Sequence, residues 1–244
     1  MADPARPVAA RPAATVMLLR DGEHGLEVFV QRRVKAMSFA AGVVAFPGGG
    51  VDESDYRGSA AWHGPDRAWW ASRWKCEQEL AEALVRSAIR ELFEECGLLL
   101  AATEAGIPAV PTRTELVDER ARLIAKEVTF DSILSSHQLG LRADLVRPWA
   151  NWITPESKPR RYDTRFFVAE VPPGQTADDQ SSEVSEAYWS RPAALLDAGR
   201  AGDVQLMAPT RTCLEELAAL VDVRSALDAA TNRNLDPIRP VAAP

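Results

Sequence analysis

The sequence predicts an α+β fold, in which a mixed sheet carries helices on both faces. Segments rich in valine, leucine and phenylalanine, typical of strands, are mixed with longer segments that lack glycine and proline, typical of helices. These segments do not follow the regular strand–helix rhythm of a doubly wound sheet. The chain has 244 residues, 46% of them hydrophobic, enough for one large domain with a sizeable core.

The strand-like segments begin with two that flank a strong hairpin signal, Asp21-Gly22-Glu23-His24-Gly25. They are Ala14–Arg20 and Leu26–Arg33. Later segments are expected to complete the sheet: Trp149–Thr154, Arg165–Val171, and a strand that begins or ends at Tyr188–Trp189.

The clearest helix is expected over Glu79–Cys96, because this segment lacks glycine and proline and is followed by Gly97, a good helix C′ residue. The other expected helices are Glu115–Glu127, Arg191–Gly199, Thr210–Val221 and Arg224–Thr231. The predicted organisation is therefore a flexible tail over residues 1–13, a domain over 14–231 and an irregular tail over 232–244.

Composition excludes several classes of protein. The three cysteines, Cys76, Cys96 and Cys213, are widely spaced and odd in number, so they predict neither a zinc site nor a disulfide framework but a reducing, cytoplasmic location. The sequence contains no run of about 18 apolar residues, so it predicts no membrane span. A formal net charge of −7 argues against a nucleic-acid binder and is compatible with an acidic site that concentrates metal cations.

The end of the Glu79–Cys96 helix carries a crowded acidic patch. On a helical wheel Ile89 and Phe93 fall on one face, whereas Glu91, Glu94 and Glu95 fall on the other. One interpretation is a solvated helix face. Against it, like charges at i, i+4 cost about 0.2–0.5 kcal/mol, and anions at a helix C-terminus cost about 0.3–1 kcal/mol. A hard cation between the carboxylates would remove both penalties.

The segment Arg90–Leu98 (RELFEECGL) resembles the second half of the Nudix box, whose pattern is Arg-Glu-apolar-x-Glu-Glu-x-Gly-apolar. Glu82 stands where that box carries its first glutamate, and Phe46-Pro47-Gly48-Gly49 is similar to the strand-to-loop entry that precedes it. The resemblance implies a Nudix-type α/β/α sandwich with a mixed sheet, to which this chain adds extra C-terminal helices.

One position departs from the box. Cys76 stands where the family has glycine, and the glycines lie at 48–50 instead, so that roughly two dozen residues are inserted, with the insert at about 56–78. The similarity is therefore to a split-box subgroup that includes enzymes acting on coenzyme A and related diphosphates. Residues 42–49 also resemble the end of the signature seen in coenzyme A Nudix enzymes, although Ser38 replaces the arginine expected upstream.

The resemblance implies Mg²⁺ or Mn²⁺ against Glu91, Glu94 and Glu95, beside the diphosphate of the substrate. Arg90 is expected to orient a glutamate by a bidentate contact. Gly48 and Gly49 are expected to let the substrate and the metal site approach the backbone closely. Water then attacks one phosphorus.

The general base differs among Nudix enzymes, and here it is expected to be a box glutamate such as Glu94 or a glutamate of a distal loop. Glu183 and Glu186 are the distal candidates, and an acidic loop without a catalytic role is the alternative.

Several arginines are candidates for holding substrate phosphates. Arg160 and Arg161 lie in a segment similar to one in split-box relatives. Arg32 lies at the end of the second expected strand, where it is a candidate to face the same pocket. A basic loop that balances a nearby acidic surface is the alternative for Arg160 and Arg161.

The insert holds four of the seven tryptophans, Trp62, Trp69, Trp70 and Trp74. Either they pack the insert onto the domain or onto a partner copy, or they form an aromatic wall of the substrate pocket.

These features favour a metal-dependent hydrolase of a nucleoside diphosphate derivative, with coenzyme A or an acyl-CoA first among the substrates. NADH, ADP-ribose, nucleotide sugars and dinucleoside polyphosphates are the alternatives. A non-catalytic nucleotide sensor is disfavoured, because such Nudix proteins usually lose box glutamates and this chain keeps them. The family often forms homodimers, so a homodimer is a further expectation.

Overall fold

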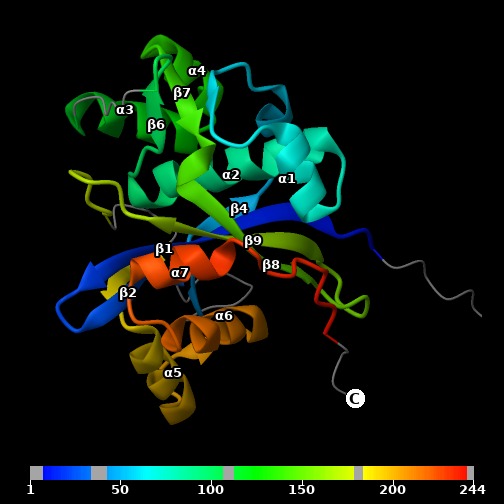
Figure 1. Cartoon of the computed structure of the whole chain (residues 1–244), viewed down its shortest axis with the longest axis vertical. Helices are drawn as coiled ribbons and strands as arrows, with labels where there is room; N and C mark the ends of the chain where they lie inside the picture. The colour runs from blue at the N-terminus through cyan, green and yellow to red at the C-terminus, as the bar shows by residue number, and fades with distance from the viewer. Residues whose placement is uncertain (1–7, 34–42, 107–112, 179–183, 241–244) are drawn as a thin grey trace, which may run out of the picture.

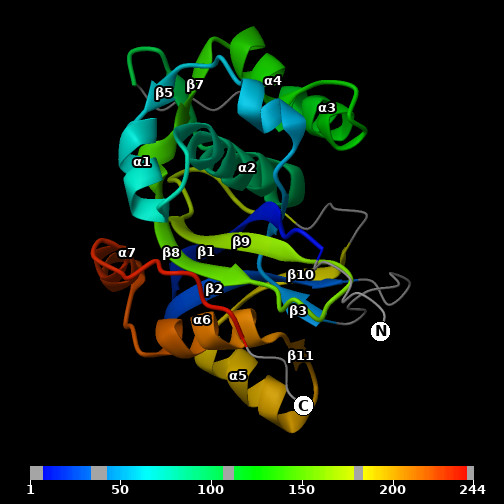
Figure 2. The ribbon, with the colours of Figure 1, turned by 90° about the vertical axis from the view of Figure 1, so that its right-hand side faces the viewer.

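The computed structural model describes residues 8–33, 43–106, 113–178 and 184–240. Its architecture confirms the α+β prediction: an eight-stranded mixed sheet lies between two helical layers, and a separate three-stranded sheet stands above one of them (Figures 1 and 2). Among the described residues, no helix is long and apolar enough to cross a membrane.

The main sheet consists of β1 (Arg11–Gly22), β2 (Gly25–Arg33), β3 (Val43–Ala45), β4 (Gly48–Gly50), β8 (Val146–Ile153), β9 (Tyr162–Glu170), β10 (Val184–Ser190) and β11 (Gln205–Leu206). The small sheet consists of β5 (Trp62–His63), β6 (Ala101–Thr103) and β7 (Leu139–Arg142). The helices are α1 (Arg67–Trp74), α2 (Gln78–Cys96), α3 (Arg113–Ile124), α4 (Phe130–Ser136), α5 (Pro192–Ala201), α6 (Ala208–Ala218) and α7 (Val223–Ala230), with 3₁₀ turns η1 (Glu53–Arg57) and η2 (Ala143–Leu145).

The glycine-rich strand β4 enters the sheet between its two longest N-terminal strands. β1 runs parallel to β9 along one edge and pairs on its other edge with β2 at Leu19–Gly22 but with β4 at Ala13–Thr15. The two strands of the hairpin therefore diverge, and β3 and β4 fill the gap. In this position the glycines of β4 lie under α2, which contacts both β1 and β4.

Two apolar cores lie on the two faces of the sheet. On one face α2 buries Leu84, Ile89 and Phe93, and on the other α5 and α6 bury residues such as Leu195 and Leu214. The helix prediction for α2 was accurate to one residue at its start. It ends before Gly97, whose φ of 67° is left-handed, as the C′ position of a helix requires.

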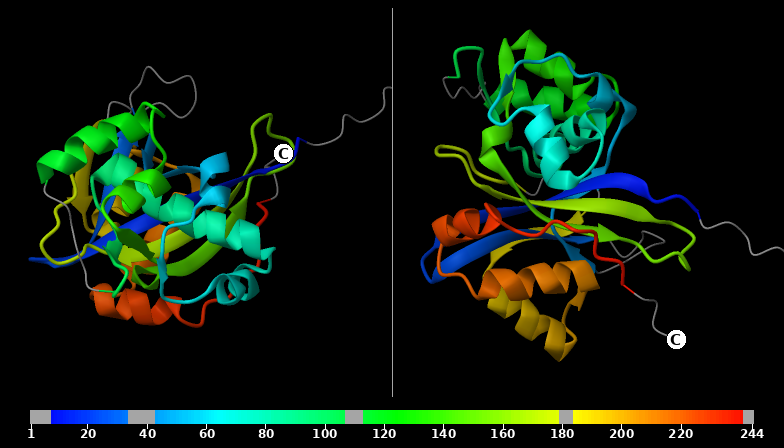
Figure 3. Two further views of the ribbon diagram at one scale, coloured as in Figure 1. Left: turned by 90° about the horizontal axis from the view of Figure 1, so that it is seen from above. Right: turned by 45° about the vertical axis from the view of Figure 1, so that its right-hand side comes forward.

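The predicted N-terminal tail needs correction. β1 begins at Arg11, so the structured chain starts before residue 14. After α7 the chain is irregular, as expected, but it is packed on the domain: Ile238 bonds through its backbone to Asn151 and Ile153 on β8, and Leu235 is buried. Figure 3 shows this segment lying along the sheet.

The insert packs on the domain through two of its tryptophans. Trp70 and Trp74 are buried on α1, with ring centroids 5.8 and 5.3 Å from that of Phe167. Trp69 is 40% exposed. Packing onto the domain therefore accounts for Trp70 and Trp74. The prediction did not include the small sheet or α4, whose elements are only two to seven residues long.

Candidate active site

The centre of the site is a buried arginine on α2. The side chain of Arg90 is 3% exposed and contacts three carboxylates. Its Nε and Nη2 donate to the two oxygens of Asp55 at 3.0 Å each, and its Nη1 donates to Glu91 at 2.8 Å and to Glu94 at 3.0 Å. We refer to Asp55, Arg90, Glu91 and Glu94 as the Arg90 cluster. The bidentate contact expected of Arg90 exists, but its partner is Asp55 and not a box glutamate.

The guanidinium also ties the helix to the glycine strand. Arg90 Nη2 donates to the carbonyl oxygen of Gly50 at 3.0 Å and to Ser87 Oγ at 3.2 Å. Burial opposes the charge of Arg90, but the hydrogen bonds to Asp55 and the charge of Glu91 raise its pKa above the ordinary value. Arg90 is therefore a permanent cation at the centre of the site.

Glu91 is buried, although it lies on the face of α2 opposite Ile89 and Phe93, so the interpretation of a solvated helix face does not hold for it. It is 7% exposed, because β4 covers this face of α2. Burial raises its pKa to about 7, and the charge of Glu94 acts in the same direction, whereas Arg90 lowers it. Burial also raises the pKa of Glu94 and of Asp55. Three carboxylates share one cation, so the cluster carries surplus negative charge when all of them are ionised.

Glu95 and the glycine strand complete the arrangement. The backbone N–H of Gly48 donates to Glu95 Oε2 at 2.8 Å. A Cβ added at Gly49 would lie 2.4 Å from Glu91 Oε1, so only glycine allows this approach. The predicted group of Glu91, Glu94, Glu95, Gly48 and Gly49 is thus brought together at one place.

The carbonyl end of α2 is satisfied by side chains that the sequence analysis missed. Arg120 on α3 donates from Nε to the carbonyl of Glu94 at 2.8 Å and from Nη1 to Asp178 at 2.6 Å. Gln31 on β2 donates to the carbonyl of Glu95 at 3.4 Å. A buried arginine therefore offsets the penalty for anions at this helix end. No local pattern identifies Arg120, because it comes from a different helix.

A second arginine lies one turn earlier on α2. Arg86 donates to Glu82 at 2.9 Å, as an i, i+4 pair on one helix, and lies 3.4 Å from Asp131. Arg67 approaches Glu82 at 3.9 Å. We refer to Arg67, Glu82, Arg86 and Asp131 as the Arg86 cluster.

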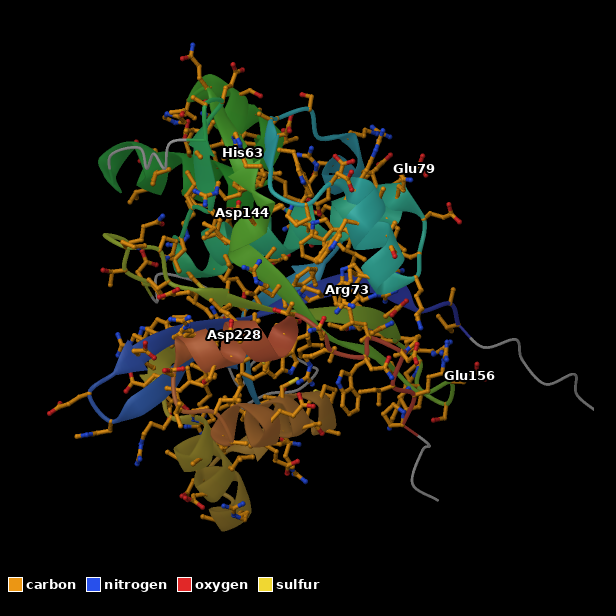
Figure 4. The ribbon with its side chains drawn as sticks, viewed as in Figure 1. His63, Arg73, Glu79, Asp144, Glu156 and Asp228 are labelled. Carbon is orange, nitrogen blue, oxygen red and sulfur yellow. The ribbon has the colours of Figure 1, made fainter. Side chains whose placement is uncertain are left out.

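The arginines expected to bind substrate lie elsewhere. On β1, Thr15 pairs with Gly48 on one side and with Phe166 on the other. Arg161 precedes Phe166 by five residues, so at about 3.3 Å per residue its backbone lies about 17 Å along the sheet from that of Gly48. Arg161 donates to the carbonyls of Thr154 and Val8, at 3.0 and 2.6 Å. Together with Arg160 it lines a separate pocket of about 340 Å³. Figure 4 shows Glu156, from the same β8–β9 connection, at the outer edge of the molecule.

Arg32 and Glu186 face the other side of the sheet from α2. Gln31 points toward α2, so its neighbour Arg32 points away, and Arg32 Nη2 lies 3.4 Å from the carbonyl of Asp203. Glu186 pairs with Arg32 in register. Neither residue therefore joins the box glutamates. The other distal candidate, Glu183, lies outside the described residues.

The residues present fit a divalent metal ion, although their side chains do not form a complete coordination shell. No group of three metal-ligating side chains is assembled in the part of the chain that the structure describes. The oxygen-rich donor set and the surplus carboxylates are nevertheless what Mg²⁺ or Mn²⁺ uses, since such ions are held by a few carboxylates together with water and phosphate oxygens.

Two curated proteins with sequences similar to this chain share the name acyl-coenzyme A diphosphatase NUDT19. The acyl-coenzyme A diphosphatase NUDT19 of Gallus gallus is 30% identical over 142 residues, which cover 50% of this chain and 37% of that protein. The protein of the same name from Xenopus laevis is 23% identical over 251 residues, covering 86% and 64%. The chain thus spans less than two thirds of these curated relatives.

A solved structure agrees over nearly the whole chain. The NUDIX hydrolase from Alicyclobacillus acidocaldarius has a TM-score of 0.75 and 30% sequence identity, covering 90% of this chain and 96% of that one. The family model of the NUDT19 Nudix domain matches residues 6–217. With the box glutamates, Arg90 and the glycine strand assembled at one site, the chain belongs to the Nudix hydrolase family, in the group described by the NUDT19 Nudix domain.

Proposed function

We propose that this protein hydrolyses the diphosphate bond of an acyl-coenzyme A or of coenzyme A, with Mg²⁺ or Mn²⁺ as cofactor. The observation that carries the proposal is the assembly of Glu91 and Glu94 on Arg90, with Glu95 bound to the glycine strand beside them. The names of the two NUDT19 relatives support the choice of substrate. Hydrolysis of another nucleoside diphosphate derivative is the alternative.

In the proposed reaction, water adds across the P–O–P bridge. One phosphorus gains the oxygen of water, the bridging oxygen leaves with the other phosphate, and the products from acyl-CoA are 3′,5′-ADP and an acyl-phosphopantetheine. A bound divalent cation would polarise the phosphoryl oxygens and lower the pKa of its water.

The protein's own residues position this chemistry. Glu91, Glu94 and Glu95 are proposed as metal ligands, and Arg90 keeps the first two in place through its Nη1. Gly48 and Gly49 let the glycine strand lie close to β1 and to Glu91, because side chains there would collide with them. The proposed general base is Glu94, whose side chain is 21% exposed and therefore reachable by water, or Glu183.

The proposal is tested with a panel of acyl-CoA, coenzyme A, NADH, ADP-ribose, UDP-glucose and diadenosine polyphosphates, each with Mg²⁺ or Mn²⁺. We expect the highest kcat/KM with acyl-CoA or coenzyme A, and 3′,5′-ADP among the products identified by mass spectrometry. Absence of 3′,5′-ADP would overturn the substrate assignment, and tight binding without turnover of any compound would favour a sensor.

We also propose a cytoplasmic location and a homodimer. The location is supported by the widely spaced cysteines, of which Cys96 and Cys213 are buried free thiols. Sedimentation of the purified chain tests the dimer, and a monomer at all concentrations would contradict it.

A further inference from the structure

The turn that leads from the glycine strand into the insert contributes a buried carboxylate to the site. Asp55 lies on η1, which follows the glycine strand, and its side chain is 3% exposed. It accepts from Arg90 Nε and Nη2 at 3.0 Å each and from the backbone N–H of Asp52 at 2.8 Å. Asp55 therefore links the guanidinium to the chain just beyond Gly50.

The contacts of Arg90 divide its donors into two groups. Nε and Nη2 bind Asp55, Gly50 and Ser87, whereas Nη1 alone contacts Glu91 and Glu94. A guanidinium is planar and rigid, so fixing one edge on Asp55 fixes the direction of Nη1. The orientation of two proposed metal ligands thus depends on a residue that touches neither of them by hydrogen bond.

Glu82 cannot do this in place of Asp55. Glu82 is the first glutamate of the box, but its carboxylate is bound to Arg86, with Arg67 nearby. Within the described residues, Asp55 is the carboxylate that holds Arg90 from the side opposite Glu91 and Glu94. The carboxylate therefore comes from the chain between the glycines and α2.

We propose that Asp55 is a positioning residue of the active site, which acts through Arg90 to set the geometry of Glu91 and Glu94 for a divalent cation. The inference rests on the proposed function, because it takes those glutamates as metal ligands. Its consequence is that η1, which leads from the glycine strand into the insert, supports the metal ligands and is not only a packing element.

The test is the affinity of the purified full chain for Mn²⁺ without substrate, measured by calorimetric titration. Asp55→Asn keeps the shape of the side chain and removes its charge. We expect its dissociation constant for Mn²⁺ to rise by about 10–100-fold, the usual loss when a partner behind a metal ligand is changed. Asp55→Glu, which keeps the charge but is longer, is expected to fall between Asp55→Asn and wild type.

The matched control is Asp131→Asn. Asp131 also ties this part of the chain to α2, since it accepts from the backbone N–H groups of Ser59 and Ala60 and lies 3.4 Å from Arg86, but it contacts none of the box glutamates. We expect this variant to lower the thermal midpoint while its Mn²⁺ affinity stays within about threefold of wild type. A purely structural role for Asp55 predicts the same behaviour for Asp55→Asn.

A double-mutant cycle tests whether Asp55 acts through Arg90. In an Arg90→Gln background, Asp55→Asn should lower the Mn²⁺ affinity by less than about threefold, because the guanidinium through which Asp55 acts is already absent. Full additivity would overturn the inference. If Asp55→Asn does not fold, Asp55→Glu is used in the same cycle.

The outcomes separate the inference from the proposed function. If wild type binds Mn²⁺ and both Asp55 variants bind it equally well, the inference fails and the function stands. If wild type binds no Mn²⁺, the proposed function and the inference fail together. If Asp55→Asn weakens Mn²⁺ but no diphosphate is hydrolysed, the inference holds and the function fails.

Discussion

The two arginine clusters on α2 differ in charge, although both arginines are buried and lie one helical turn apart. In the Arg86 cluster two carboxylates, Glu82 and Asp131, face two arginines, and Asp131 also accepts three hydrogen bonds from Ser59 and Ala60. In the Arg90 cluster three carboxylates face one arginine. The first is balanced and acts as an anchor, whereas the second carries surplus negative charge, which is the property of a cation site.

The largest effect is expected from removing the cation of the unbalanced cluster. Arg90→Gln leaves Asp55, Glu91 and Glu94 without their common partner, so the free energy of unfolding in EDTA should fall by about 3–5 kcal/mol. Arg86→Gln should cost less, because Asp131 keeps its other donors and Glu82 keeps Arg67. Urea denaturation measures both. Equal losses would contradict the difference between the clusters.

Activity should depend on the charge of Glu95. Glu95→Gln can still accept from Gly48 but has no charge for a metal, so kcat/KM for acyl-CoA should fall by more than about 100-fold, beyond the usual loss for a residue behind the ligands. Glu79→Gln on the same helix is the control, because Glu79 is exposed at the outer edge of the molecule (Figure 4). Comparable losses in both variants would refute the role of Glu95.

Stability without metal should depend on pH through Glu91. Its pKa is raised by burial to about 7, against 4.5 when exposed, so between these values the folded protein binds more protons than the unfolded one. The free energy of unfolding should therefore fall as pH rises from about 4.5 to about 7, by on the order of 2–3 kcal/mol from this group. Glu91→Gln should flatten the slope, leaving the part due to Asp55 and Glu94. Denaturation in EDTA at several pH values measures this, and an unchanged slope would disprove it.

A methyl group at Gly49 should disturb the site, whereas one at Gly50 should not. A Cβ at Gly49 would lie 2.4 Å from Glu91 Oε1, but at Gly50 it would meet nothing within 4 Å. We expect Gly49→Ala to lower kcat/KM by about 10-fold or more, in line with the roughly 1–3 kcal/mol of overpacking, and Gly50→Ala to change it less than about twofold. The reverse order would show that the approach of Gly49 to Glu91 is not needed.

The smallest effect is expected at the arginine pocket. Arg160→Ala should change KM for acyl-CoA by less than about threefold with kcat unchanged, because this pocket lies about 17 Å along the sheet from Gly48. A tenfold rise in KM would instead show that Arg160 contributes to substrate binding.

The sequence predicted those parts of the molecule that local patterns determine. The periodicity of α2 and its ending at Gly97 placed the helix and the spacing of Glu91, Glu94 and Glu95, because both are properties of a single helix. The wheel placed Glu91 on the face opposite Ile89 and Phe93 but could not show that β4 covers that face. Burial on a helix depends on what packs against it, which a wheel does not contain.

Long-range partners could not be predicted in the same way. Asp55 and Arg120 lie 35 and 26 residues from their partners on α2, and no spacing rule connects them. The one available signal for Asp55 was the pair Asp52 and Asp55 at i, i+3 before a turn, typical of a reciprocal cap. The strands of the small sheet are two to four residues long, too short for an alternating pattern.

Calorimetric titration of Mn²⁺ into wild type and into Glu91→Gln and Glu79→Gln tests most directly whether the unbalanced cluster is a cation site. We predict binding to wild type and Glu79→Gln with similar affinity and a loss of more than about 10-fold in Glu91→Gln. Unchanged Mn²⁺ affinity in Glu91→Gln would contradict the assignment of the Arg90 cluster as the metal site.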